Sequence, residues 1–171
     1  QDEEYQTIVA AGLAQVGEKN RQEVAEPLFT FDSNRPIVQQ IIERPFREAA
    51  FSKLVKDEYG LTCAMTGITI KNDRGIAEVE AAHIKPVKFN GPDSVRNGIA
   101  LCRTFHWMFD HGLVSVADSG DIMVKNNVPP KIYQLLNSNG RIRLPSNSIS
   151  SPHPSFLKFH REVIYNSAAY R

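Results

Sequence analysis

The sequence contains few of the residues that mark several protein classes. Only two of its 171 residues are cysteine, at positions 63 and 102, whereas a secreted disulfide-stabilised domain of this size usually carries more. No stretch approaches the roughly 18 apolar residues that a membrane span needs. The first five residues are acidic and polar, unlike a secretion signal. These absences predict a protein of a reducing cytosol without a membrane segment.

The chain also lacks an excess of positive or negative charge. The chain has 20 basic and 19 acidic residues, a formal net charge of +1. A protein that coats nucleic acid without specificity is usually far more basic, but an enzyme needs only a local basic strip, so DNA is not excluded. The hydrophobic fraction of 42 % is ordinary for a globular protein, and the length suits one domain or a small catalytic domain with appended helices.

The first 60 residues predict helices. Apolar spacing favours one helix over residues 5–16 and a second over 36–43. Pro45 is suited to the first turn of a third helix, which would run to about Tyr59. Gly60 then provides the stop.

After Gly60 the pattern changes to short strands and turns. Strands are predicted over residues 68–70, 76–84 and 99–102, a helix over 104–110, and a β-hairpin from 113–116 and 121–124. Helices over 129–136 and 156–165 follow. Together with the earlier helices, these elements predict an α+β fold.

Three blocks in the middle of the chain carry the candidate chemistry. They are Glu80-Ala-Ala-His83-Ile-Lys-Pro86, Asn97-Gly-Ile-Ala-Leu-Cys102 and His106-Trp-Met-Phe-Asp110-His-Gly-Leu113. The order His, Asn, His across strand, loop, strand and helix resembles the HNH nucleases of the ββα-metal fold. With the Cys63-Ala-Met-Thr-Gly67 turn, it is similar to the branch found in bacterial restriction endonucleases. The resemblance covers about residues 43–125. It implies an N-terminal helical segment (1–42), an HNH core (43–125) and a C-terminal helical extension packed on the core (126–171).

The resemblance assigns a catalytic set of His83, Asn97 and His106. His83 occupies the position of the general base, and imidazole suits that role because its pKa lies near neutral pH. His106 occupies the metal-ligand position. Asn97 matches the middle Asn, which braces the loop and orients the base. Asp110 lies one helical turn after His106 and projects from the same face, so it is a candidate second metal ligand.

The expected cofactor is a divalent metal ion, Mg²⁺ with Mn²⁺ or Ni²⁺ as alternatives. Many family members carry an Asp or His ligand directly before the base, and this chain has Ala82 there. Asp110 or Glu80 would fill the gap, and we favour Asp110. Glu80 has two further interpretations: it orients a phosphate-binding Arg, or, by default, it is a solvated strand residue.

A structural zinc ion is not expected. Many HNH domains hold Zn²⁺ with two Cys-x-x-Cys pairs, but Thr66 and Phe105 stand at the second positions here. Two thiolates cannot complete a tetrahedral site without other ligands. We expect the two cysteines to be buried as small apolar residues, with core packing in place of zinc by three aromatic residues: Phe105, Trp107 and Phe109.

Four basic residues flank the predicted site and are candidates for contacts with DNA phosphates: Lys85, Lys88, Arg96 and Arg103. The alternative is ordinary solvent-facing charge. The expected partner is double-stranded DNA. Cutting both strands requires two active sites or two visits, which favours a homodimer. His111 is interpreted as incidental, and His153 and His160 receive no role.

The sequence therefore predicts a metal-dependent endonuclease that hydrolyses DNA phosphodiester bonds in a restriction or defence system of the bacterial cytoplasm. A DNA-binding module with a decayed nuclease site is the alternative, supported by Ala82 and the low net charge. A third hypothesis takes the chain as one domain of a larger restriction enzyme, as the start at Gln1 without Met suggests.

Overall fold

The computed structural model describes residues 37–167. The chain divides into two compact units, residues 1–50 and 51–171, with the boundary inside helix α2 (Ile37–Glu58). The helix predicted over residues 5–16 lies outside the described residues. The expected break at Pro45 is wrong, because α2 continues through it. A proline inside a helix removes one backbone donor, and the helix-favouring residues Glu43-Arg44 and Arg47-Glu48-Ala49-Ala50 flank it.

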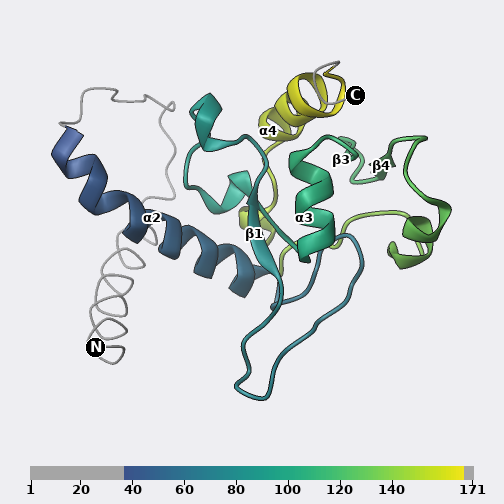
Figure 1. Ribbon diagram of the computed structural model, residues 1–171, viewed down its shortest axis with the longest axis horizontal. Coiled ribbons are helices and arrows are strands. Elements are labelled where there is room, and N and C mark those ends of the chain that lie inside the picture. Colours follow the sequence, from purple (N-terminus) through teal and green to yellow (C-terminus); the bar gives the residue numbers. More distant parts are fainter. Residues whose placement is uncertain (1–36, 168–171) are drawn as a thin grey trace. The chain divides into compact units, whose positions relative to one another are not determined.

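The second unit contains the predicted strand–strand–helix arrangement (Figure 1). Strands β1 (Glu80–His83) and β2 (Gly98–Leu101) are antiparallel, with Glu80 opposite Leu101 and His83 opposite Gly98. Helix α3 (Arg103–Asp110) follows β2 and contacts both strands. The α+β fold with a ββα core is therefore confirmed.

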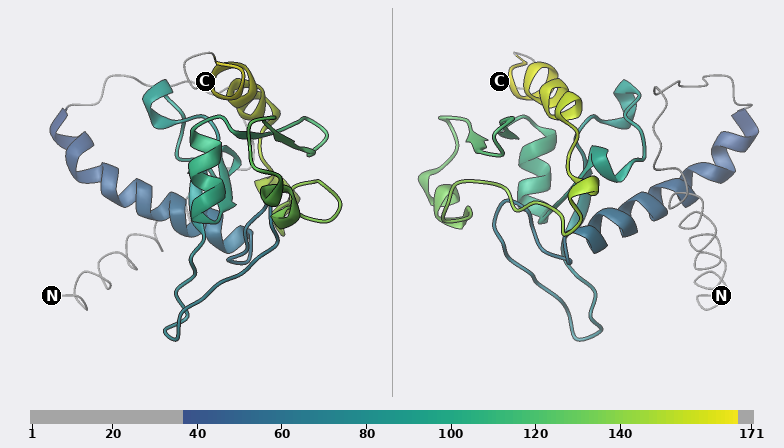
Figure 2. Two further views of the ribbon diagram at one scale, coloured as in Figure 1. Left: turned by 45° about the vertical axis from the view of Figure 1, so that its right-hand side comes forward. Right: turned by 180° about the vertical axis from the view of Figure 1, so that it is seen from behind.

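The segment before β1 differs from the prediction. Residues 68–70 form no strand, and the strand expected over 76–84 is limited to β1. Only an isolated bridge between Lys71 and Ala77 links the two arms. Figures 1 and 2 both show this segment projecting from the rest of its unit. An isolated two-stranded ribbon has no second layer to cover it, which keeps its pairing short.

The C-terminal part begins with the predicted hairpin of β3 (Val114–Val116) and β4 (Ile122–Val124). The helix expected over 129–136 is a 3-10 helix, Pro130–Leu135. The last predicted helix is α4 (Pro154–Phe159), which continues as a π-helix, His160–Tyr165. Within residues 37–167, no helix combines the length and apolar character required to cross a bilayer.

The core of the second unit forms where the second half of α2 meets the ββα strands. Phe51, Val55 and Tyr59 are buried there. A Cβ on Gly98 would lie 2.2 Å from the Val55 side chain and 3.0 Å from Phe51. Gly98 thus lets the helix pack directly on β2, because any larger residue would push it away. This close packing brings Phe51 to the end of β1, where His83 lies.

Several hydrogen bonds join the C-terminal part to the turn at residues 63–67. The backbone N–H groups of Asn137 and Arg143 donate to the carbonyls of Met65 and Ala64, each at 2.8 Å. The Asn137 side chain also donates to the Ala64 carbonyl at 2.8 Å. Ala64 in turn donates to the Ala100 carbonyl of β2 at 2.8 Å. Residues 137–143 therefore support the turn that leads into the ββα core.

Candidate active site

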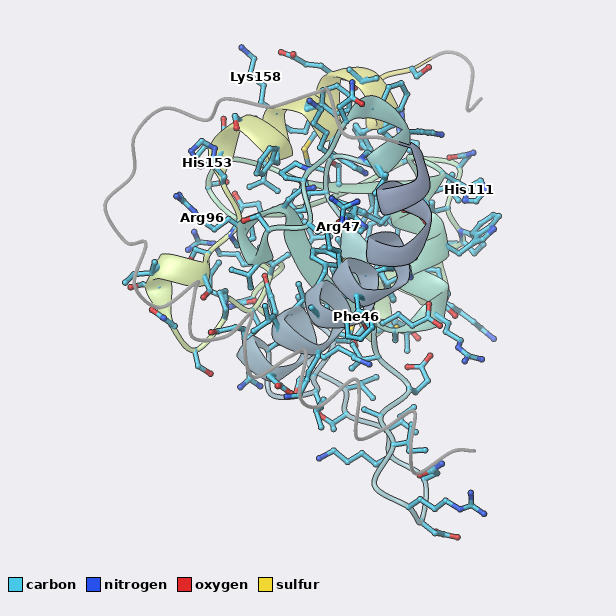
Figure 3. The ribbon with its side chains drawn as sticks, turned by 90° about the vertical axis from the view of Figure 1, so that its left-hand side faces the viewer. Phe46, Arg47, Arg96, His111, His153 and Lys158 are labelled. Atoms are coloured by element: carbon cyan, nitrogen blue, oxygen red, sulfur yellow. The ribbon has the colours of Figure 1, made fainter. Side chains whose placement is uncertain are left out.

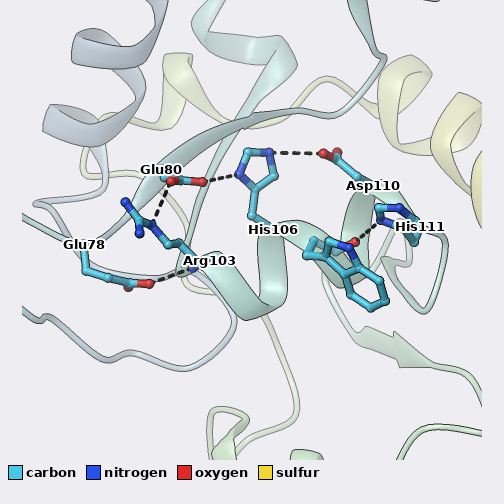
Figure 4. Close-up of polar contacts among 7 residues, drawn as sticks. Glu78, Glu80, Arg103, His106, Asp110 and His111 are labelled. Atoms are coloured by element: carbon cyan, nitrogen blue, oxygen red, sulfur yellow. Dashed lines mark hydrogen bonds and ion pairs between the residues drawn. The ribbon is translucent and has the colours of Figure 1, made fainter.

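His106 lies between two carboxylates (Figure 4). Its Nδ1 is 2.9 Å from Glu80 Oε2, and its Nε2 is 3.4 Å from Asp110 Oδ2. Glu80 comes from the first position of β1, and Asp110 from the next turn of α3. The His106 side chain is 23 % exposed. The packing of α3 on β1 thus assembles an acid–imidazole–acid row at the edge of the core.

Glu80 holds more than one partner. Its Oε1 accepts a hydrogen bond from Arg103 Nε at 3.1 Å, while the Arg103 backbone N–H donates to Glu78 at 2.9 Å. Burial raises the pKa of Glu80, but the hydrogen bonds and charges of His106 and Arg103 outweigh it, so the pKa lies below its usual value. The Glu80 side chain is 42 % exposed, so it keeps the contact with solvent that we expect by default, and it also anchors His106 and Arg103.

Asp110 connects the two candidate histidines electrostatically. Partial burial raises its pKa, against the lowering effect of four nearby groups: His106, His111, Lys88 and His83. Asp110 lies beside His106 on α3, and α3 packs on β1, the strand that His83 ends.

His83 ends β1 with two contacts that fix its ring. Its Nε2 is 2.9 Å from Asp93 Oδ1. The ring stacks on Phe51, with centroids 3.9 Å apart and planes 14° from parallel. The side chain remains 17 % exposed. No sequence pattern indicates Asp93, because it lies ten residues after His83 within a loop whose Pro-Asp-Ser composition is typical of a turn.

Asn97 joins the two ends of the loop over residues 85–97. Its buried side chain accepts a hydrogen bond from the Lys85 N–H at 2.8 Å. Its Nδ2 donates to the carbonyls of Lys85 at 3.0 Å and Pro92 at 2.9 Å. An amide side chain is suited to this position because it donates and accepts at once. Its place in the catalytic set stays a prediction.

The four predicted phosphate contacts divide into two pairs. Arg103 donates a hydrogen bond to Glu80, and the charge of Lys88 lowers the pKa of Asp110. Lys85 Nζ instead lies 5.1 Å from the centre of the Phe159 ring. Arg96 lies beside His153, whose N–H donates to the Arg96 carbonyl at 2.9 Å, and Figure 3 shows this pair apart from His111. Contact of any of the four with DNA stays a prediction.

Trp107 corrects one prediction about α3. It is 57 % exposed, whereas Phe105 and Phe109 are buried as expected. Residues 105 and 109 are four apart and share the inner face of the helix, so residue 107 points outward. The indole stacks on His111, with centroids 4.4 Å apart. Packing by Trp107 therefore does not stand in for zinc.

The two cysteines are both free thiols, Cys63 buried and Cys102 partly buried. Their side chains hydrogen-bond to each other, and Thr66 adds a contact to Cys63. The burial expected for both therefore holds fully only for Cys63. Phe105, at the other missing Cys position, is 1 % exposed and belongs to the core.

His106 and Asp110, the two predicted metal ligands, would offer a metal ion one nitrogen and one oxygen atom. In the described part of the chain no group of three or more His, Cys, Asp or Glu residues could hold a metal, and Ala82 is buried with no donor atom. Mg²⁺ keeps several waters and needs only one or two protein carboxylates. The raised pKa of Asp110 marks a carboxylate that a cation would stabilise. The pair therefore fits a hydrated divalent ion.

Comparisons with known proteins agree with this geometry. Residues 63–117 match the model of an HNH endonuclease family. Among solved structures, the chain is similar to a modification-dependent TagI restriction endonuclease, with a TM-score of 0.59 and 25 % sequence identity; the match covers 80 % of this chain and 47 % of that one. The chain thus spans about half the length of that protein. A search of curated proteins found no match. The whole His, Asn, His series lies within residues 63–117, the part of the chain that matches the HNH endonuclease family.

Proposed function

We propose that the chain is a metal-dependent endonuclease that hydrolyses DNA phosphodiester bonds within a restriction or defence system of the bacterial cytoplasm. The observation that carries this proposal is the ββα arrangement, in which His83 ends β1 and His106 lies on α3, the helix that packs on β1, within the residues that match an HNH endonuclease family. The HNH domain and the likeness to a restriction endonuclease support DNA as the substrate.

His83 is the general base in this proposal. Its neutral imidazole accepts a proton from water, and the water oxygen attacks the phosphorus of the scissile phosphodiester. The bond from phosphorus to the 3′ oxygen breaks, which leaves a 5′-phosphate and a 3′ oxyanion, and the oxyanion takes a proton from solvent water to become the 3′-hydroxyl. The pKa of a histidine side chain is suited to this step, because both protonation states are accessible near neutral pH.

His106 and Asp110 would hold the divalent ion, Mg²⁺ in the first instance and Mn²⁺ or Ni²⁺ as substitutes. When bound, the ion supplies charge stabilisation for the leaving oxygen and the crowded phosphate. Glu80 accepts a hydrogen bond from His106 Nδ1–H, which turns Nε2 toward Asp110. A carboxylate behind a ligating histidine fixes the ring and raises its basicity.

Double-stranded DNA is the proposed partner, with phosphates contacted by Lys85, Lys88, Arg96 and Arg103. Such contacts position a duplex without reading its sequence. Two further proposals carry over from the sequence: a homodimer to cut both strands, and no structural zinc. Light scattering of the purified chain and its metal content by mass spectrometry test them; a monomer that cuts both strands, or one zinc ion per chain, would contradict them.

A plasmid-nicking assay tests the main proposal. Supercoiled DNA is incubated with the wild-type chain and with Mg²⁺, Mn²⁺ or Ni²⁺, and we expect nicked and linear products that disappear with EDTA. His83→Ala and His106→Ala remove cleavage, whereas His153→Ala, outside the site, retains it. No cleavage with any of the metals would favour a DNA-binding module with a decayed site. Cleavage that survives His83→Ala would reject the mechanism.

A further inference from the structure

We propose that Asp93 is a positioning residue for His83, and that it selects the imidazole nitrogen that receives the proton. Asp93 holds the tautomer with its proton on Nε2, which leaves Nδ1 to accept the proton of water. The functional consequence rests on the proposed role of His83 as the base, but the tautomer itself does not.

The contact defines the direction of the hydrogen bond. His83 Nε2 and Asp93 Oδ1 are 2.9 Å apart, with side chains 17 % and 28 % exposed. An ionised carboxylate only accepts hydrogen bonds, so Nε2 must donate. A neutral imidazole carries a single N–H, and its other nitrogen is then an acceptor. The contact to Asp93 therefore leaves Nδ1 without a proton in the neutral ring.

Stacking alone would not make this choice. Phe51 fixes the plane of the His83 ring at a centroid distance of 3.9 Å. A flat apolar surface does not distinguish the ring from the same ring turned by 180°, because either orientation lays a flat face of the imidazole on it. A carboxylate at one edge distinguishes them, because only one orientation brings Nε2 to Asp93. Phe51 and Asp93 therefore supply separate constraints, one on the plane and one on the orientation.

The backbone holds Asp93 firmly enough for this role. Asn97 Nδ2 donates to the carbonyl of Pro92, the residue before it, and the Asn97 N–H donates to the carbonyl of Ser94, the residue after it, at 2.8 Å. At Gly91 a Cβ would lie 1.7 Å from the Lys85 carbonyl oxygen, so the loop closes on itself. The motif residue Asn97 thus acts on the base through Asp93.

Nitrogen-15 NMR of the histidine-labelled chain measures the tautomer. The measurement is made at about pH 8, which lies above the usual pKa of histidine. The His83 signals are identified by their loss in His83→Gln. We expect a proton on Nε2 in the wild type and a shift toward Nδ1–H in Asp93→Asn, because an amide can also donate to Nε2. Asp57→Asn, which removes an exposed carboxylate paired with Lys53, leaves the His83 signals unchanged.

Single-turnover cleavage with saturating DNA supplies the second readout. Asp93→Asn is expected to lower the rate constant about 10- to 100-fold, part of the roughly 10²–10⁴-fold that a positioned general base contributes. The Kd for DNA stays the same, because Asp93 makes no proposed contact with DNA. Asp93→Glu keeps a carboxylate and recovers the Nε2–H tautomer and most of the rate.

Each outcome decides one of the two proposals. A wild-type ring with its proton on Nδ1 overturns the role of Asp93, and this result needs no variant to fold. Equal rate losses in Asp93→Asn and Asp93→Glu overturn it too, because the loop rather than the carboxylate would then matter. A tautomer that responds to Asp93→Asn in a chain that never cleaves DNA supports the positioning role and rejects the nuclease proposal.

Discussion

Two regions of the molecule each stack a histidine on a phenylalanine, yet the two histidines differ in exposure and in their polar partners. His83 lies 3.9 Å from Phe51 and faces the Asp93 carboxylate. His160 lies 3.6 Å from Phe109, with planes 11° apart, and is 1 % exposed. Its Nδ1 accepts from the Ser115 hydroxyl at 2.8 Å, and its Nε2 donates to the Phe109 carbonyl at 3.0 Å.

The comparison shows that stacking on an aromatic ring does not by itself indicate chemistry. Burial lowers the pKa of His160 to about 4, although the Phe109 carbonyl acts in the other direction. With neutral partners and no access to water, His160 stays uncharged and joins β3 and α3 to the C-terminal helix. His83 has an anionic partner and a solvent-accessible edge, which are what a proton-transfer group requires.

The largest expected effects distinguish these two histidines, because one substitution lowers activity and the other lowers stability. His83→Ala is expected to lower cleavage about 10²–10⁴-fold, because the base is gone. His160→Ala is expected to lower the free energy of unfolding by about 2–4 kcal/mol, from lost packing and two buried groups without a partner. Urea unfolding and plasmid nicking on both variants measure this. Should His160→Ala fold normally and lose cleavage, the distinction would be wrong.

Acid should destabilise the chain through His160. An unfolded histidine has a pKa of about 6.5, and the folded value is about 4. Below pH 6.5 the unfolded chain binds a proton that the folded chain does not, so stability falls as the pH is lowered to about 4, by at most about 3 kcal/mol. The free energy of unfolding, measured at a series of pH values from 7.5 to 4, tests this loss of stability. In His160→Gln the slope is shallower, and identical slopes would refute the assignment.

Glu80→Gln tests the surroundings of His106, because this substitution removes the negative charge beside Nδ1 and keeps the shape of the side chain. We expect the Mg²⁺ concentration for half-maximal cleavage to rise about 10- to 100-fold, as for other partners of metal-ligating histidines. Glu78→Gln is the matched control, since the Glu78 carboxylate accepts a hydrogen bond from the backbone N–H of Arg103 and not from His106. If both variants respond equally to Mg²⁺, Glu80 does not act through His106.

Lys88→Ala should produce the smallest effect. Removal of one phosphate contact weakens DNA binding across sequences and lowers the slope of log Kd against log salt concentration by about 1. Fluorescence anisotropy of a labelled duplex at several salt concentrations measures the slope. Lys131→Ala is the control, as its exposed side chain lies on the 3-10 helix far along the chain from the motif. If the slope is unchanged in Lys88→Ala, Lys88 does not contact a DNA phosphate.

The sequence predicted the parts of the site that depend on local spacing. His106 and Asp110 are four residues apart on one helix, so their shared face follows from helical geometry alone. The ββα order of strands and helix was readable from apolar runs and glycine stops. The exposure of Trp107 was also predictable, because Trp107 lies midway between Phe105 and Phe109, which share the buried face of α3.

The contacts that complete the site could not be predicted in the same way. Asp93 reaches His83 only because Asn97 closes a loop, and loop closure depends on three dimensions rather than on a periodic pattern. Glu80 looked like a solvated strand residue because its partner His106 is 26 positions away. His160 and Ser115 are 45 positions apart. The continuation of α2 through Pro45 likewise overrides a local rule.

The hydrogen bonds from residues 137–143 to the 63–67 turn decide which part of this ββα fold can be moved into another protein. The block that matches the family ends at residue 117, but its first turn is supported by Asn137 and Arg143. A chimera that grafts residues 63–117 alone onto a foreign DNA-binding domain would leave the Ala64 and Met65 carbonyls without these donors. The transferable cassette therefore runs from the second half of α2 to the C-terminal π-helix.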